Sequence, residues 1–213
     1  MTLSIDRQRT ALLCLHLQND IVDEKGALAL AGFGAAKMVA KHDVLPKTAR
    51  LQGAARDAGV KVFHVAIRLR PDYADAPKSS PLMRACIDAS SLIEGTWGAG
   101  FPPSVAPQPN DVVVVNKATG AFTTSDLRNR LSSEINTLLL AGVATNFVVE
   151  STAREGSDLG YEVIVVRDCC TANSEEAHQA ALNTSLPHLA TIADSDEVIA
   201  ALSRPAQAMA GSS

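Results

Sequence analysis

The chain has 213 residues, 46% of them hydrophobic and 20% charged, which is ordinary for one globular domain with an ample core. Its formal net charge is −4, no block of like charge stands out, and only 4% of its residues are aromatic. These values argue against a protein that binds nucleic acid or a membrane surface.

Short apolar runs alternate with stretches of helical periodicity along the chain. The apolar runs predict strands at residues 10–15, 61–66, 111–115, 137–141, 162–166 and 190–193. The periodic stretches predict helices at residues 45–58, 126–133, 145–159, 175–189 and 195–202. Continuous apolar strands that alternate with helices are typical of a parallel sheet covered on both faces.

The sequence therefore predicts a single α/β domain with a doubly wound, mostly parallel, six-stranded sheet of Rossmann-like type. Its expected bounds are residues 10–203, between an N-terminal tail (1–9) and a flexible C-terminal tail (204–213). Ligands of such sheets bind beyond the carboxyl ends of the strands. The proline-rich segment 70–109 is expected to be irregular and indicates a functional lid, an interface element or a plain surface excursion.

The four cysteines, Cys14, Cys86, Cys169 and Cys170, show no CxxC spacing. They favour reduced thiols over a disulfide framework or a zinc site. The polar N-terminus does not resemble a signal peptide, and no apolar run reaches the 18 residues of a membrane span. We therefore expect a cytoplasmic protein without a metal or another cofactor.

Four segments carry a family resemblance: ALLCLHLQND at 11–20, EGTWGAGFPP at 94–103, VVVNKATGAFTTSDL at 113–127, and the stretch at 138–172 that contains GVATNFVVESTAR. In this order they resemble the signatures of the isochorismatase-like (cysteine hydrolase) superfamily. The resemblance covers roughly residues 10–190. It implies the strand order 3-2-1-4-5-6, a small-molecule substrate, and a homo-oligomer (a dimer or a tetramer).

The resemblance also implies a catalytic triad of Asp, Lys and Cys, and this chain departs from it twice. Lys117 matches the lysine, but His16 stands at the aspartate position in HLQ, and Val148 stands at the cysteine position. Valine has no nucleophilic atom, so thioester chemistry at Val148 is excluded. The family also implies a cis peptide bond at Val143–Ala144, with an oxyanion hole at Ala144 and Val148.

His16 and Lys117 are the candidate catalytic residues. Imidazole suits acid–base work near neutrality, and Lys117 beside it would favour the neutral form. Such a mechanism predicts a pH limb with an apparent pKa between about 6 and 7. A purely structural His16 is the alternative. Lys117 without its aspartate needs a substitute anion if it is buried.

Trp97, Phe122 and Val148 are the candidate substrate-binding residues, by their match to the pocket of the family. For Trp97, ordinary packing is the alternative. Asn19 and Asp20 are expected to cap the turn after the first strand. No pattern typical of the metal-binding branch of the family is present.

Two functional hypotheses follow. The first is a hydrolase that cleaves an amide, ureide or vinyl-ether bond of a small molecule without a cysteine nucleophile. The second is a catalytically silent family member that binds a small ligand or a partner. A pocket joining His16, Lys117 and Trp97 would favour the enzyme.

Overall fold

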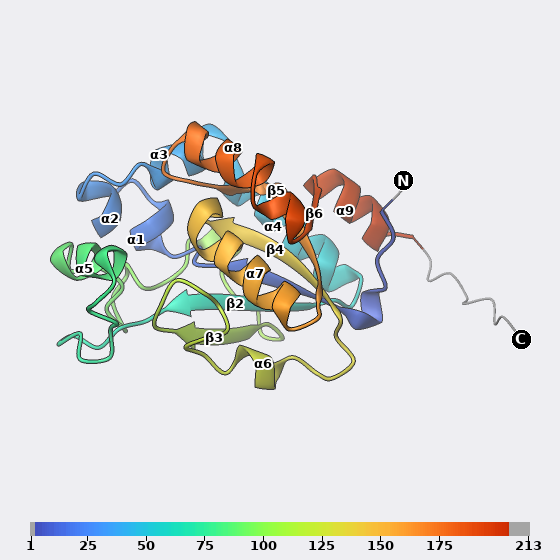
Figure 1. The fold of residues 1–213 in the computed structure, drawn as a ribbon, viewed down its shortest axis with the longest axis horizontal. Coiled ribbons are helices and arrows are strands. Elements are labelled where there is room, and N and C mark those ends of the chain that lie inside the picture. The colour runs from blue at the N-terminus through green and yellow to red at the C-terminus, as the bar shows by residue number, and fades with distance from the viewer. Residues whose placement is uncertain (1–2, 205–213) are drawn as a thin grey trace, which may run out of the picture.

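The computed structural model describes residues 3–204, which form one α/β domain around a six-stranded, all-parallel sheet (Figure 1). The sheet order is β3-β2-β1-β4-β5-β6. The strands are β1 (Thr10–Leu15), β2 (Lys61–Ile67), β3 (Val112–Asn116), β4 (Thr137–Val143), β5 (Glu162–Thr171) and β6 (Thr191–Ala193). The predicted fold class and strand order are confirmed. The predicted flexible tail lies, from residue 205 on, outside the described residues.

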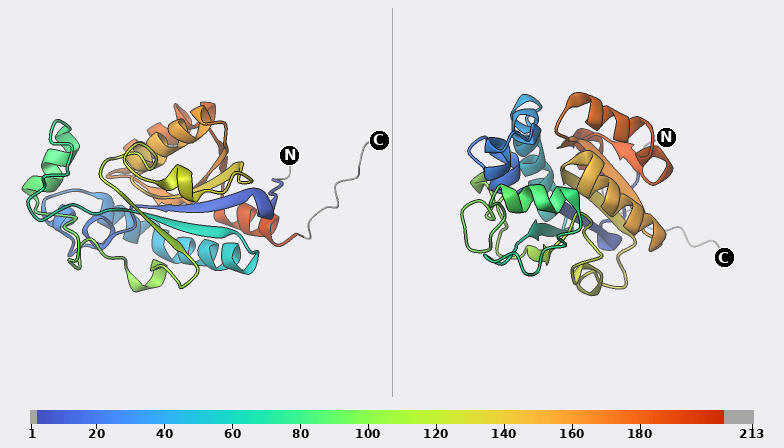
Figure 2. Two further views of the ribbon diagram at one scale, coloured as in Figure 1. Left: turned by 90° about the horizontal axis from the view of Figure 1, so that it is seen from below. Right: turned by 60° about the vertical axis from the view of Figure 1, so that its left-hand side comes forward.

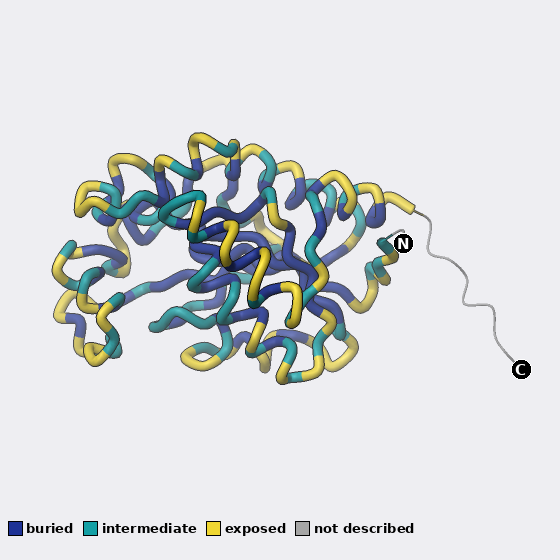
Figure 3. Tube along the Cα trace, turned by 45° about the horizontal axis from the view of Figure 1, so that its top comes forward, coloured by how far each residue is buried: buried dark blue, intermediate teal, exposed yellow. Residues whose placement is uncertain are grey.

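Each face of the sheet has its own helical layer, as Figure 2 shows. One layer contains α3 (Ala35–Lys41), α4 (Val44–Asp57) and α9 (Ser195–Leu202), and the other contains α6 (Leu127–Arg130), α7 (Glu150–Asp158) and α8 (Glu175–Asn183). Alternate residues of β1 explain the two layers: Leu12 and Cys14 join the first core, whereas Leu13 and Leu15 join the second. The strands are accordingly buried along most of their length in the centre of the molecule (Figure 3).

The predicted strand at 162–166 is too short, because β5 continues to Thr171. The register between β4 and β5 shifts between Leu140 and Gly142, after which Gly142 pairs with Cys170. This irregularity accommodates the polar Arg167 and Asp168, at which the apolar pattern of the sequence stops.

Several short helices escaped the sequence prediction. The connection after β1 contains α1 (Asn19–Val22), α2 (Ala27–Leu30) and α3. The segment 70–109, expected to be irregular, contains α5 (Pro81–Asp88) and a 3-10 turn (Pro103–Val105). Ser80 caps α5 by accepting a hydrogen bond from the Met83 N–H, and Pro81 occupies its first turn, an arrangement typical of helix starts.

Three predicted helices differ in their bounds. The helix expected at 126–133 is the single turn α6, and that expected at 175–189 ends at Asn183, before a 3-10 turn (Leu186–His188). The helix expected at 145–159 begins with a π-helical turn, η3 (Thr145–Val149), and continues as α7. A further 3-10 turn (Arg7–Arg9) precedes β1. Within residues 3–204, no helix is both long and apolar enough to cross a membrane.

Candidate active site

A cavity of about 70 Å³ lies at the carboxyl end of the sheet, where β1 and β4 meet. This is the point at which the strand order reverses, the usual ligand site of doubly wound sheets. The strand ends contribute His16, Val143 and Ala144, and η3 contributes Phe147 and Val148. Helix α5, at the end of the molecule opposite the described termini in Figure 1, closes the outer side.

The lining of the cavity is uncharged. Its polar residues are His16, Thr119 and Asn173, and the rest of the wall is apolar or sulfur-bearing, as at Met83 and Cys86. The volume is enough for several water molecules or a compact small molecule. An apolar cavity with a few polar groups is a typical small-molecule site.

His16 turns the chain at the end of β1. Its φ is +54°, in the left-handed region that non-glycine residues seldom occupy and that is often found at functional sites. Its N–H still donates to the Val65 carbonyl, at 2.9 Å. The side chain is buried, with Nε2 3.1 Å from Oδ1 of Asn116.

The partners of Asn116 fix the tautomer of His16. The Asn116 amide nitrogen donates to the carbonyl oxygens of Ala118 (2.7 Å) and Gly120 (2.9 Å). Its Oδ1 must therefore be the atom that faces His16, and because this oxygen only accepts, Nε2 of His16 carries the proton. Nδ1 is then an unprotonated acceptor, and it makes no hydrogen bond to any residue between 3 and 204.

Burial lowers the pKa of His16 to about 4, and the hydrogen bond to Asn116 offsets this only in part. The imidazole is therefore neutral at pH 7, as predicted, but the cause is loss of solvation rather than repulsion by Lys117. The expected pH limb between about 6 and 7 is corrected accordingly to a limb near 4.

Val148 and Ala144 both line the cavity. The peptide bond between Val143 and Ala144 is cis, as the resemblance implied. Val148 is 1% exposed, so its apolar side chain is buried in the wall of the cavity. The assignment of the two residues to an oxyanion hole stays a prediction.

Lys117 does not line the cavity. Its ammonium lies 2.7 Å from Oδ2 of Asp75 and also donates to the carbonyl oxygen of Arg68. Asp75 is therefore the substitute anion that the sequence analysis required. It comes from the loop after β2, which the sequence pattern could not place next to β3.

Trp97 and Phe122 also do not line this cavity, and their predicted role in substrate binding stays a prediction. Trp97 is 56% exposed. Phe122 stacks on Tyr161 with ring centroids 6.1 Å apart, next to the core beneath α7. The pocket expected to join His16, Lys117 and Trp97 thus contains only His16.

Two buried polar residues, one of which had no predicted role, hold together the segments next to the cavity. Gln18 donates to the carbonyl oxygens of Ile67 (2.7 Å) and Ala99 (2.9 Å) and accepts from the Ile67 N–H. Asp20 accepts from the N–H groups of Ala27 and Leu92. Contrary to the prediction, Asp20 does not cap the turn after β1. It joins the start of α2 to the segment after α5.

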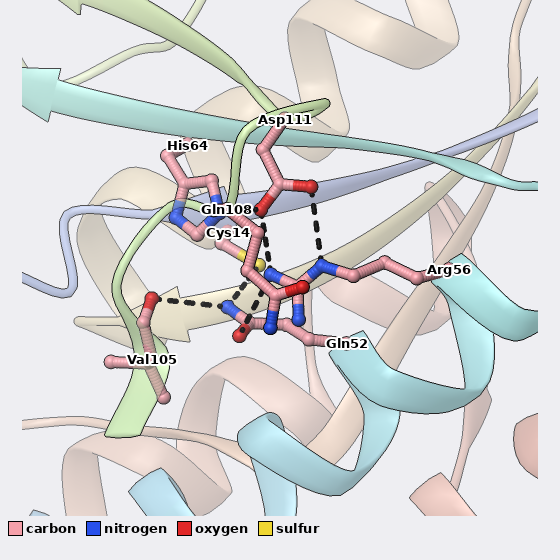
Figure 4. A network of polar contacts seen from close by, with 7 residues as sticks. All are labelled: Cys14, Gln52, Arg56, His64, Val105, Gln108 and Asp111. Atoms are coloured by element: carbon pink, nitrogen blue, oxygen red, sulfur yellow. Dashed lines mark hydrogen bonds and ion pairs between the residues drawn. The ribbon is translucent and has the colours of Figure 1, made fainter. Parts of the chain in front are cut away.

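Cys86 is the one cysteine of the described chain that lines the cavity, and burial raises the pKa of its thiol. Cys14 lies on the other side of β1, in the polar network of Figure 4. There Gln52 donates to its sulfur at 3.2 Å, and burial raises its pKa to about 12. None of these thiols has the lowered pKa of a reactive nucleophile.

The same network contains a second buried histidine. Nε2 of His64 lies 3.1 Å from Oδ2 of Asp111, which also accepts from Arg56 at 2.6 Å and from the Gln108 N–H at 2.9 Å (Figure 4). The network ties β2 to α4 and to the loop before β3. It has no part in the wall of the cavity. Within residues 3–204, no group of three or more His, Cys, Asp or Glu residues could hold a metal ion.

Comparison with known proteins agrees with this arrangement. A family model described as the isochorismatase domain matches residues 10–197. The uncharacterized isochorismatase family protein YecD of Escherichia coli is 30% identical over 201 residues, covering 94% of this chain and all of the relative. The ureidoacrylate amidohydrolase RutB of Methylorubrum extorquens is 32% identical over 178 residues, covering 78% of this chain and 71% of the relative.

A solved structure of an isochorismatase family protein from Burkholderia thailandensis superimposes with a TM-score of 0.76 at 33% identity. The match covers 95% of this chain and 99% of that structure. The fold of this chain therefore has a counterpart among solved structures.

Proposed function

Because this chain belongs to the isochorismatase family, we propose that it hydrolyses the C–N bond of a small, neutral amide or ureide without a cysteine nucleophile. The observation that carries the proposal is the neutral imidazole of His16 in an otherwise uncharged cavity, with Nδ1 free to accept a proton. The name of one relative, ureidoacrylate amidohydrolase, supports the amide or ureide bond type; the neutral charge of the substrate is inferred from the uncharged cavity wall alone.

The proposed step uses His16 first as a base and then as an acid. Nδ1 accepts a proton from a water molecule while the water oxygen attacks the carbonyl carbon. The N–H groups of Ala144 and Val148 are the proposed donors to the resulting oxyanion. When the C–N bond breaks, the imidazolium returns its proton to the leaving nitrogen, which restores the neutral His16.

The pKa of His16 argues against the vinyl-ether alternative. Cleavage of a vinyl ether needs a proton donor, and with a pKa of about 4 only about one imidazole in 1,000 is protonated at pH 7. The Nε2 proton is engaged by Asn116, and the ammonium of Lys117 by Asp75. An attack by base-activated water needs no such donor.

Binding without turnover is the second candidate function, and the position of Lys117 favours it. Lys117 matches the catalytic lysine of the family, yet it lies outside the cavity wall and forms an ion pair with Asp75. Together with Val148 this leaves the cavity without the charged and nucleophilic groups of the family triad. Such a protein would keep the cavity as a receptor for a small neutral ligand.

One experiment separates the two candidates. A panel of small amides, ureides and isochorismate is incubated with the wild-type protein, with His16→Asn and with His188→Asn, whose histidine is exposed. Hydrolysis and the ligand-induced shift in Tm are both measured. Turnover that His16→Asn loses and His188→Asn keeps supports the hydrolase, with a rate that is flat above about pH 5.

Three other outcomes contradict the proposed hydrolase. Turnover that survives in His16→Asn would remove His16 from the mechanism. Ligand-induced Tm shifts without turnover by the wild-type protein would establish the silent receptor. Isochorismate as the preferred substrate would reject the amide assignment. The homo-oligomer and the cytoplasmic location stay predictions, the first testable by light scattering.

A further inference from the structure

Lys117 does not line the cavity, but it lies in sequence between two residues that belong to the site. Asn116 precedes it and holds His16, and Thr119 follows it and lines the cavity. The Lys117 N–H donates to Oγ1 of Thr124 at 2.9 Å, which fixes the backbone. The direction of its side chain therefore determines where its positive charge lies.

Asp75 sets that direction. Its Oδ2 lies 2.7 Å from the Lys117 ammonium, and its Oδ1 accepts from the Arg70 N–H at 3.0 Å. Burial acts to raise the pKa of Asp75, but the hydrogen bonds from Lys117 and Arg70 outweigh it and leave the pKa below its usual value. The side chain is thus a carboxylate over the working pH range.

The loop that carries Asp75 is anchored to the cavity wall. The Tyr73 hydroxyl donates to the Ser91 carbonyl at 2.9 Å. The Tyr73 ring belongs to a buried cluster with Met83, Cys86 and Leu92, all three of which line the cavity. Asp75 is therefore held in a defined place relative to the site.

We propose that Asp75 is a specificity-determining residue that draws the Lys117 ammonium away from the cavity and makes the site select neutral over anionic ligands. The inference rests on the cavity being the ligand site of the proposed function. It adds the charge class of the ligand and the residue responsible. The uncharged wall is consistent with it, because a carboxylate buried there would lack a counter-charge.

The expected size of the effect is modest. The side chains of Lys117 and Asp75 are 29% and 23% exposed, so the pair lies between a surface and a buried ion pair. A surface-like pair contributes up to about 1 kcal/mol, which corresponds to about a fivefold change in a binding constant. Release of Lys117 should thus change the ratio of the affinities for an anionic and a neutral ligand about fivefold.

The test uses acetamide and acetate, which have nearly the same shape, differ in charge and suit a cavity of about 70 Å³. Their Kd values are measured by calorimetry for the wild-type protein, Asp75→Asn and Asp72→Asn. Asp72 is the matched control, because it lies in the same loop and pairs with the exposed Arg70 instead. We expect Asp75→Asn to favour acetate over acetamide about fivefold relative to wild type, and Asp72→Asn to leave the ratio unchanged.

The double variant Asp75→Asn/Lys117→Met should return to the wild-type ratio, since the gain requires the ammonium. An unchanged ratio in Asp75→Asn, a gain that persists in the double variant, or the absence of binding of both probes overturns the inference. Because binding is measured without turnover, a silent protein with the expected change in ratio would refute only the hydrolase. An active hydrolase with an unchanged ratio would refute only the role of Asp75.

Discussion

Acidification from pH 7 to pH 4 should destabilise the protein through the imidazole of His16. Burial lowers the folded-state pKa of this group to about 4, whereas an unfolded histidine titrates near 6.5. Between these two values the unfolded chain binds the proton and the folded chain does not. The free energy of unfolding is therefore highest above about pH 6.5 and falls as the pH drops towards 4.

The magnitude follows from the two pKa values. A difference of about 2.5 units is worth about 3 kcal/mol when both states have titrated, and about 2 kcal/mol of this is lost by pH 5. His16 is only 4% exposed, so solvent screening reduces this figure little. Against a total stability of about 5–15 kcal/mol, such a loss is readily measured.

Urea unfolding at pH 7, 6, 5 and 4.5 provides the assay, with the wild type, His16→Asn and His188→Asn compared. Asparagine is the suitable replacement because it tolerates the φ of +54° found at position 16. Burial also lowers the pKa of His64 and of His178, but these groups are common to all three proteins. The difference between wild type and His16→Asn thus isolates His16.

The free energy of unfolding of the wild type should fall by about 2 kcal/mol more than that of His16→Asn between pH 7 and pH 5. His188→Asn should follow the wild type. Parallel curves for wild type and His16→Asn would refute the reasoning, because they would mean that His16 titrates alike in the folded and unfolded states.

Three further predictions concern the frame around the site. Asp111→Asn removes the carboxylate shared by Arg56 and His64. We therefore expect urea unfolding to show that the free energy of unfolding falls by about 3 kcal/mol. A fall of less than about 1 kcal/mol would contradict the structural role of the network. Gly142→Ala places a Cβ 2.2 Å from the Leu15 carbonyl oxygen at a φ of +154° and should lower Tm. Gly53→Ala, which meets nothing within 4 Å, should raise Tm slightly; equal shifts would reject the steric argument. The four buried cysteines should react with a thiol reagent far more slowly in the folded protein than in urea, and rapid labelling of the native protein would contradict their burial.

The layers of this fold could be predicted because the central strands β1 and β4 are apolar runs buried on both faces. β1 has the predicted bounds for this reason, and α9 has them because the capping box of Asp194 and Glu197 marks its start. Short helices such as α1 and α2 depend instead on tertiary contacts. Asp20, for example, stabilises the start of α2 by accepting from the Ala27 N–H, and no periodicity in four residues could reveal that contact.

The site was predictable at strand ends and not in loops. His16, Ala144 and Val148 end or follow strands, so topology alone brings them to one cavity. Trp97 belongs to a connection whose course depends on packing, and it lies elsewhere. The Lys117–Asp75 pair joins residues 42 positions apart in sequence, one directly after β3 and the other in the loop after β2. Proximity of that kind has no signature in spacing or composition.

The amide of Asn116 has a consequence for how position 16 can change. Its NH₂ group donates to the carbonyl oxygens of Ala118 and Gly120. The side chain at position 16 therefore faces the Oδ1 atom of Asn116, which can only accept, and must donate a hydrogen bond to it. An aspartate there would set two acceptors against each other. Substitutions at 16 and 116 are therefore coupled, and an aspartate at position 16 would need a coordinated change at position 116, not a single step.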